Sequence, residues 1–136
     1  MAPATGRLAD TAALPPGTLV HVGRLRGETT RLSLLDYDAE GLREIQDPDQ
    51  DQIAALAGQP SVTWVRVEGL HDLELIASLG RAFGLHPLVQ EDIVNTSQRP
   101  KVEDYGEYLY LVLRAVLWDE DDQEWRSEQI SLVLGQ

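Results

Sequence analysis

The chain has 136 residues, of which 43% are hydrophobic and 25% charged, and this fits one globular domain with a real core. It contains no cysteine, which excludes disulfides, thiolate metal sites and cysteine nucleophiles. Its 23 acidic and 11 basic residues give a net charge of -12, which disfavours nucleic acid and anionic lipid as partners. The same charge favours divalent cations and also keeps a protein soluble.

The first half of the chain predicts a flexible arm followed by a β-rich region. Residues 1–17 are rich in Ala, Pro and Thr and lack an apolar stretch, so they predict an arm and not a signal peptide. A single domain is expected over residues 18–136. Its first elements are predicted as strands over residues 19–23, 30–37, 42–46 and 62–67, with a short helix over residues 48–57.

Two helices are predicted next in the chain, over residues 72–83 and 87–95. Asp72 can cap the start of the first helix, and Gly84 can end it in the left-handed conformation. Pro87 suits the first turn of the second helix. Residues 97–100 then predict a connector.

The last part of the chain predicts a long β-hairpin. Residues 108–118 are apolar on both faces except at Arg114, which indicates a strand inside a sheet covered on both sides. The apolar run at residues 108–113 is far shorter than the about 20 residues that span a bilayer, so no direct membrane contact is expected of this segment. The returning strand is predicted over residues 125–134, with Ile130, Leu132 and Leu134 facing inward. Together the elements predict a layered α/β domain.

Two acidic loops offer possible metal sites. Residues 36–41 followed by Asp47 imitate a calcium loop, although the last ligand is usually Glu and the flanking residues predict strands. The alternative for this loop is a solvated hairpin turn. Residues 119–122 carry four adjacent acidic side chains, which repel one another and usually remain solvated.

A third acidic pair, Glu91 and Asp92, lies on the second predicted helix. Neighbouring helical residues point about 100° apart, so the two carboxylates do not easily chelate one ion together. Asp92 lies near the C-terminal end of the helix, where the dipole disfavours a negative charge by about 0.3–1 kcal/mol. A nearby cation would reverse this penalty, and the pattern favours a lysine or arginine over a metal ion in that role.

The residue pattern does not indicate an enzyme. His21, His71 and His86 are scattered, without the spacing of a catalytic triad. The sequence also lacks a glycine-rich phosphate loop.

Five segments of the stretch 62–136 resemble the CorA magnesium transporter family, in the order and spacing of that family. They are WVRVEGLHD at 64–72, FGLHPL at 83–88, EDIVN at 91–95, QRPKVE at 98–103 and EQISLVL at 128–134. The resemblance implies an α/β/α sandwich around a mixed sheet, placed at the cytoplasmic face of the cell membrane in a longer parent. It implies a homopentameric channel for Mg²⁺, often also passing Co²⁺ or Ni²⁺.

The resemblance also implies a regulatory role for bound Mg²⁺. In this family cytosolic Mg²⁺ held between subunits keeps the channel closed, which makes Asp92 an expected ligand and Glu91 part of a neighbouring site. Partner carboxylates are expected from a stalk helix. That stalk, the next sheet strand, two transmembrane helices and a Gly-Met-Asn pore motif are expected to lie beyond Gln136.

The sequence therefore predicts a soluble Mg²⁺-sensing domain that does not transport alone and binds Mg²⁺ weakly by itself. Two alternatives remain open at this point. One is the equivalent domain of a zinc-transporting relative, and the other is a stand-alone soluble adaptor.

Overall fold

The computed structural model describes residues 14–22, 29–56 and 58–135, and these divide into two compact units. One unit contains the described residues up to position 22 together with residues 87–135. The other contains the described residues between positions 29 and 86. Residues 1–13 of the predicted arm lie outside the described ranges, and the single domain expected over residues 18–136 stays a prediction.

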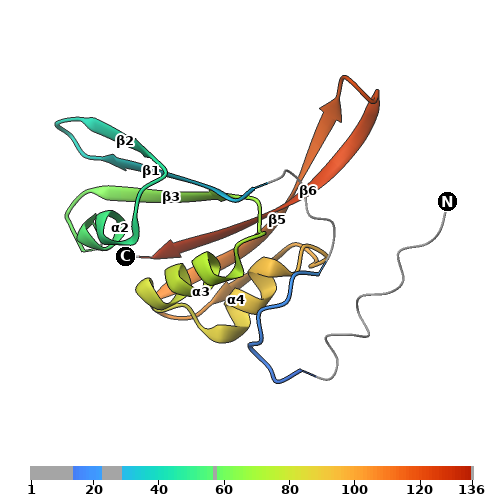
Figure 1. The fold of residues 1–136 in the computed structure, drawn as a ribbon, viewed down its shortest axis with the longest axis horizontal. Coiled ribbons are helices and arrows are strands. Elements are labelled where there is room, and N and C mark those ends of the chain that lie inside the picture. The colour runs from blue at the N-terminus through green and yellow to red at the C-terminus, as the bar shows by residue number, and fades with distance from the viewer. Residues whose placement is uncertain (1–13, 23–28, 57, 136) are drawn as a thin grey trace. The chain divides into compact units, whose positions relative to one another are not determined.

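The unit between positions 29 and 86 combines one sheet with two helices (Figure 1). Its elements are β1 (Arg31–Tyr37), β2 (Leu42–Gln46), α2 (Gln50–Leu56), β3 (Val62–Glu68) and α3 (Leu73–Ala82). The strand order is β2-β1-β3, and both pairings are antiparallel.

The central strand β1 carries the core of this unit. Leu32 and Leu34 are buried and cluster with Ile53 of α2, because alternate residues of a strand face the same side. The Asp72 side chain accepts a hydrogen bond from the Leu75 backbone N–H at 2.9 Å, which confirms the predicted cap of α3.

The second unit has one helix packed on a three-stranded sheet (Figure 1). Its elements are α4 (Pro87–Val94), β4 (Lys101–Asp104), β5 (Tyr108–Asp119) and β6 (Glu124–Gly135), with the strand order β4-β5-β6. Val89 of α4 clusters with Tyr110 and Val112 of β5, and all three side chains are fully buried. The face of the sheet that carries Tyr110 and Val112 therefore packs against α4.

The hairpin of β5 and β6 is longer than the part of it that is covered. Tyr110 and Val112 are buried, whereas Val116 is 63% exposed and Leu117 and Trp118 are also exposed. The prediction that both faces of this strand are covered is therefore wrong for its second half. An apolar side chain fits a strand whether or not another element covers it, so alternation alone does not define where the core ends.

The inward face predicted for β6 is also wrong at two positions. Ile130 and Leu134 are exposed, and Val133 instead joins the cluster around Val89. The register explains this, because Val133 pairs with Tyr110, and residues paired across two strands lie on one face.

The predicted α/β class is confirmed. Among the described residues the strands form two antiparallel sheets where one mixed sheet was expected. The pairs β1–β2, β4–β5 and β5–β6 are joined by short turns, which favour antiparallel pairing. The strand predicted over residues 19–23 is, up to position 22, an isolated parallel bridge between Val22 and Asn95. Strand β4 was not predicted. No helix in the described ranges is both long and apolar enough to cross a membrane.

Candidate functional site

Helix α4 carries both acidic residues that the sequence singles out. Pro87 begins the helix, as its fixed φ and missing N–H favour at a first helical position. Val89 and Ile93 fix the apolar side of the helix against the sheet. Glu91 and Asp92 follow on the remaining sides, and each is engaged by a different part of the fold.

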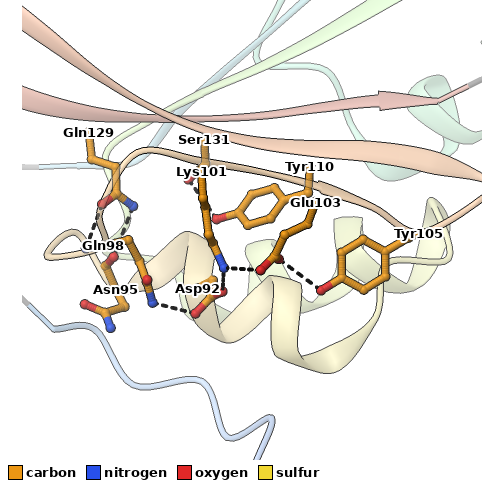
Figure 2. Close-up of polar contacts among 9 residues, drawn as sticks. All are labelled: Asp92, Asn95, Gln98, Lys101, Glu103, Tyr105, Tyr110, Gln129 and Ser131. Atoms are coloured by element: carbon orange, nitrogen blue, oxygen red, sulfur yellow. Dashed lines mark hydrogen bonds and ion pairs between the residues drawn. The ribbon is translucent and has the colours of Figure 1, made fainter.

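Both oxygens of the Asp92 carboxylate are hydrogen-bonded within the chain (Figure 2). Oδ1 accepts a hydrogen bond from Gln98 Nε2 at 2.5 Å, and Oδ2 accepts one from the Lys101 ammonium at 2.5 Å. The Asp92 and Lys101 side chains are 23% and 26% exposed. The pair is therefore partly shielded from water, so its attraction is screened less than that of a surface ion pair. The predicted cationic partner of Asp92 is confirmed as a lysine.

Strand β4 presents Lys101 and Glu103 toward α4. Lys101 pairs with Val112 and Glu103 pairs with Tyr110, so both lie on the covered face of the sheet. The Lys101 ammonium lies 2.9 Å from Glu103 Oε1 and 5.5 Å from the centre of the Tyr110 ring. One ammonium thus contacts two carboxylates and an aromatic face at once (Figure 2).

These contacts determine the protonation of Lys101. Burial lowers the pKa of the ammonium, but the hydrogen bonds and negative charges of Asp92 and Glu103 outweigh burial and raise the pKa overall. The side chain is therefore a permanent cation at neutral pH. For the neutral hydroxyl of Tyr110, burial acts in the opposite direction and raises the pKa. The hydrogen bond with Ser131 has a smaller, lowering effect.

The neighbouring carboxylate of Glu91 is hydrogen-bonded to the N-terminal segment of this unit. Its Oε2 accepts a hydrogen bond from the Gly17 backbone N–H at 2.7 Å. Glu91 and Asn95 also line a small pocket of about 40 Å³ together with residues of the 14–22 segment. The carboxylates of Glu91 and Asp92 thus have separate partners and do not chelate a common ion in this conformation.

Side chains from the sheet hold the loop that follows α4. Gln129 accepts a hydrogen bond from the Gln98 N–H at 3.1 Å and donates one to the Asn95 carbonyl at 3.0 Å. Arg114 donates to the carbonyls of Thr96 and Gln98. This explains the one charged residue that interrupts the two apolar faces predicted for β5, and it fixes Gln98 beside Asp92.

In the two acidic loops that were considered as alternative metal sites, carboxylates bind groups within the same hairpin. In the β1–β2 turn, Asp38 Oδ1 accepts hydrogen bonds from the N–H groups of Glu40 and Gly41 at 2.7 and 3.0 Å, so this segment is a hairpin turn. In the β5–β6 turn, Arg126 forms ion pairs with Asp119 at 2.9 Å and with Asp122.

The described ranges contain no group of three or more metal-ligating side chains that could hold an ion. Carboxylate oxygens are ligands that Mg²⁺ accepts, so the side chains of Asp92 and Glu91 are of a type that suits the ion. Sequence reasoning missed Lys101, Gln98, Glu103 and Tyr110 as parts of this site. The signal available was the penalty on a carboxylate at a helix C-terminus, which indicates a cation but does not identify it.

Comparison with known proteins shows a similarity to one family of transporters. The family model described as CorA-like Mg²⁺ transporter protein matches residues 59–136. A curated relative, the cobalt/magnesium transport protein CorA of Thermotoga maritima, is 38% identical over 128 residues. The alignment covers 94% of this chain and 36% of the relative, so the chain spans about a third of the length of that protein.

Proposed function

The chain belongs to the CorA-like Mg²⁺ transporter family, and we propose that it is a cytosolic Mg²⁺-sensing region of a channel for Mg²⁺ and Co²⁺. In this proposal it regulates transport and is not an enzyme. It works at the cytoplasmic face of the membrane, as one of several identical subunits arranged as a pentamer.

The observation that carries the proposal is the placement of Asp92. The residue stands in the family-matched region, on a helix packed against a buried core, with its carboxylate in a fixed orientation. A carboxylate held in this way loses little conformational entropy when it becomes a metal ligand. The acidic residues of the β5–β6 turn lie at the exposed end of a hairpin, and two of them are engaged by Arg126.

In this proposal each subunit contributes part of the Mg²⁺ site. Asp92 supplies one carboxylate and Glu91 belongs to a neighbouring site. Since the described part of the chain lacks a three-ligand cluster, the second carboxylate is expected from another subunit. Shared ligands would make occupancy by Mg²⁺ hold neighbouring subunits together, which is how binding could keep a pore closed.

The experiment that tests this function compares two changes in the full-length parent. Asp92→Asn should weaken the closure of the channel by Mg²⁺, so that flux persists at Mg²⁺ concentrations that silence the wild type. Asp121→Asn combined with Asp122→Asn removes more negative charge, from the β5–β6 turn, and should leave closure unchanged. Flux assays in which both variants behave alike would remove the case for Asp92.

A further inference from the structure

We infer that Lys101 is a built-in competitor of the regulatory cation, and that it sets how much Mg²⁺ is needed to occupy Asp92. The inference rests on the proposed function of Asp92 and adds a residue that controls it. It starts from the observation that the Asp92 carboxylate already has a cation, 2.5 Å from Oδ2.

The carboxylate has no oxygen without a protein partner in this conformation. Oδ1 is held by Gln98 and Oδ2 by Lys101. A cation approaching Asp92 must therefore displace one of these donors or share the carboxylate with it. Sharing with Lys101 places a positive ion beside a positive ammonium, and their repulsion weakens binding.

Lys101 also has a second acceptor within reach. Its ammonium contacts Glu103 Oε1 at 2.9 Å, and it lies 5.5 Å from the centre of the Tyr110 ring. When Lys101 releases Asp92, it therefore keeps Glu103 and the ring as partners. The exchange leaves no buried charge unpaired, so Lys101 can yield to a cation without disrupting the core.

The pair gives two states of the same carboxylate. In one state Lys101 neutralises Asp92 within the chain, and in the other a divalent cation does so while Lys101 pairs with Glu103 alone. Both cations compete for one acceptor. The free energy needed to break the Lys101–Asp92 ion pair therefore reduces the net free energy of metal binding to Asp92. A stronger Lys101–Asp92 pair means that more Mg²⁺ is required.

The test measures Mg²⁺ binding by titration calorimetry on this 136-residue chain. Lys101→Gln keeps a donor near Asp92 but removes the charge, and it should tighten Mg²⁺ binding by about tenfold. Lys101→Arg keeps the charge and should bind Mg²⁺ as weakly as the wild type does. The double variant Lys101→Gln with Asp92→Asn should lose the gain.

The matched control is Arg126→Gln, which removes a cation from Asp119 and Asp122 in the β5–β6 turn. It changes the net charge by the same amount as Lys101→Gln. An equal gain in affinity for both variants would mean that only total charge matters and would overturn the inference. An unchanged affinity in Lys101→Gln would overturn it as well.

A second measurement uses the wild-type chain and does not depend on how a variant folds. The ¹⁵Nζ resonance of Lys101 is followed by NMR during an MgCl₂ titration, with the side-chain resonance of Arg126 as the reference. Displacement from Asp92 should shift the Lys101 signal together with the Asp92 carboxylate signal. A Lys101 signal that stays in place while the Asp92 signal moves would refute the competition.

These results separate the inference from the proposed function. If Asp92→Asn abolishes closure in the parent but Lys101→Gln binds Mg²⁺ no tighter, Asp92 is a sensor and Lys101 is merely structural. If the Lys101→Gln chain binds Mg²⁺ tighter but the parent channel with Asp92→Asn still closes normally, Lys101 and Mg²⁺ do compete for Asp92, but this competition does not regulate the channel.

Discussion

The hydroxyl of Tyr110 lies 3.3 Å from the hydroxyl of Ser131, across the ladder between β5 and β6. Tyr110 is fully buried, and the Lys101 ammonium lies 5.5 Å from the centre of its ring. The buried hydroxyl is thus satisfied within the sheet, while the charges of Asp92, Lys101 and Glu103 act on it from α4 and β4.

The raised pKa of Tyr110 predicts a loss of stability at alkaline pH. The unfolded chain releases the tyrosine proton near pH 10, but the folded chain retains it. The contribution is therefore fully present below about pH 10 and is lost as the pH rises through the folded pKa. Urea unfolding between pH 9 and pH 11 should show a steeper decline for the wild type than for Tyr110→Phe.

Lys101 contributes in the same direction in both proteins, because its folded pKa is also raised above that of the unfolded chain. The comparison with Tyr110→Phe cancels this shared term. Parallel curves for the two proteins would show that Tyr110 keeps an ordinary pKa in the folded state.

Two valines on one strand provide a test of where the core ends. Val112 and Val116 lie on the same face of β5, but Val112 is fully buried and Val116 is 63% exposed. Val112→Ala should lower the free energy of unfolding by about 1.5–3 kcal/mol, whereas Val116→Ala should change it by less than about 0.5 kcal/mol. Denaturant titrations measure both values, and similar losses would mean that the outer half of the hairpin is packed.

The chain by itself should bind Mg²⁺ weakly and without preference over Ca²⁺. Glu91 and Asp92 are directed to different partners, so a given ion meets one carboxylate at most from this pair. The charge of -12 still attracts cations diffusely, but salt screens that attraction within about 8 Å at physiological ionic strength. Calorimetric titrations at physiological salt should show low-affinity, salt-sensitive binding that does not distinguish Mg²⁺ from Ca²⁺. A Mg²⁺-selective site of micromolar affinity would instead mean that one chain carries a complete sensor.

Much of the fold could be predicted from local pattern. The helix from Leu73 to Ala82 was predicted because its cap, its apolar stripe and its terminating glycine agree. Strands β1, β2 and β3 were predicted from alternation and turn residues. Strand β4 was missed because its inward residues are Lys101 and Glu103, and charged side chains on a covered face hide the usual apolar alternation.

The candidate site was predictable only in part, for a related reason. The helix dipole indicates that Asp92 needs a cation, but the cation comes from nine residues further along the chain, through the pairing of β4 with β5. Register between strands is a tertiary property, and it decides which face Lys101 occupies. The prediction of which face of β6 points inward was wrong for the same reason. Ile130 and Leu134 belong to the more apolar face, but Val133 is the residue that pairs with Tyr110 and packs in the core cluster.

Trp118 and Trp125 make an edge-to-face contact with ring centres 5.1 Å apart, which gives the far end of the β5–β6 hairpin its own spectroscopic signal. All three tryptophans of the chain are substantially exposed, and the third, Trp64, belongs to β3. Indole emission therefore responds to solvent at these surface positions and reports poorly on the buried clusters. Two indoles this close couple their electronic transitions, so circular dichroism in the aromatic bands can follow opening of the hairpin end separately from loss of the core.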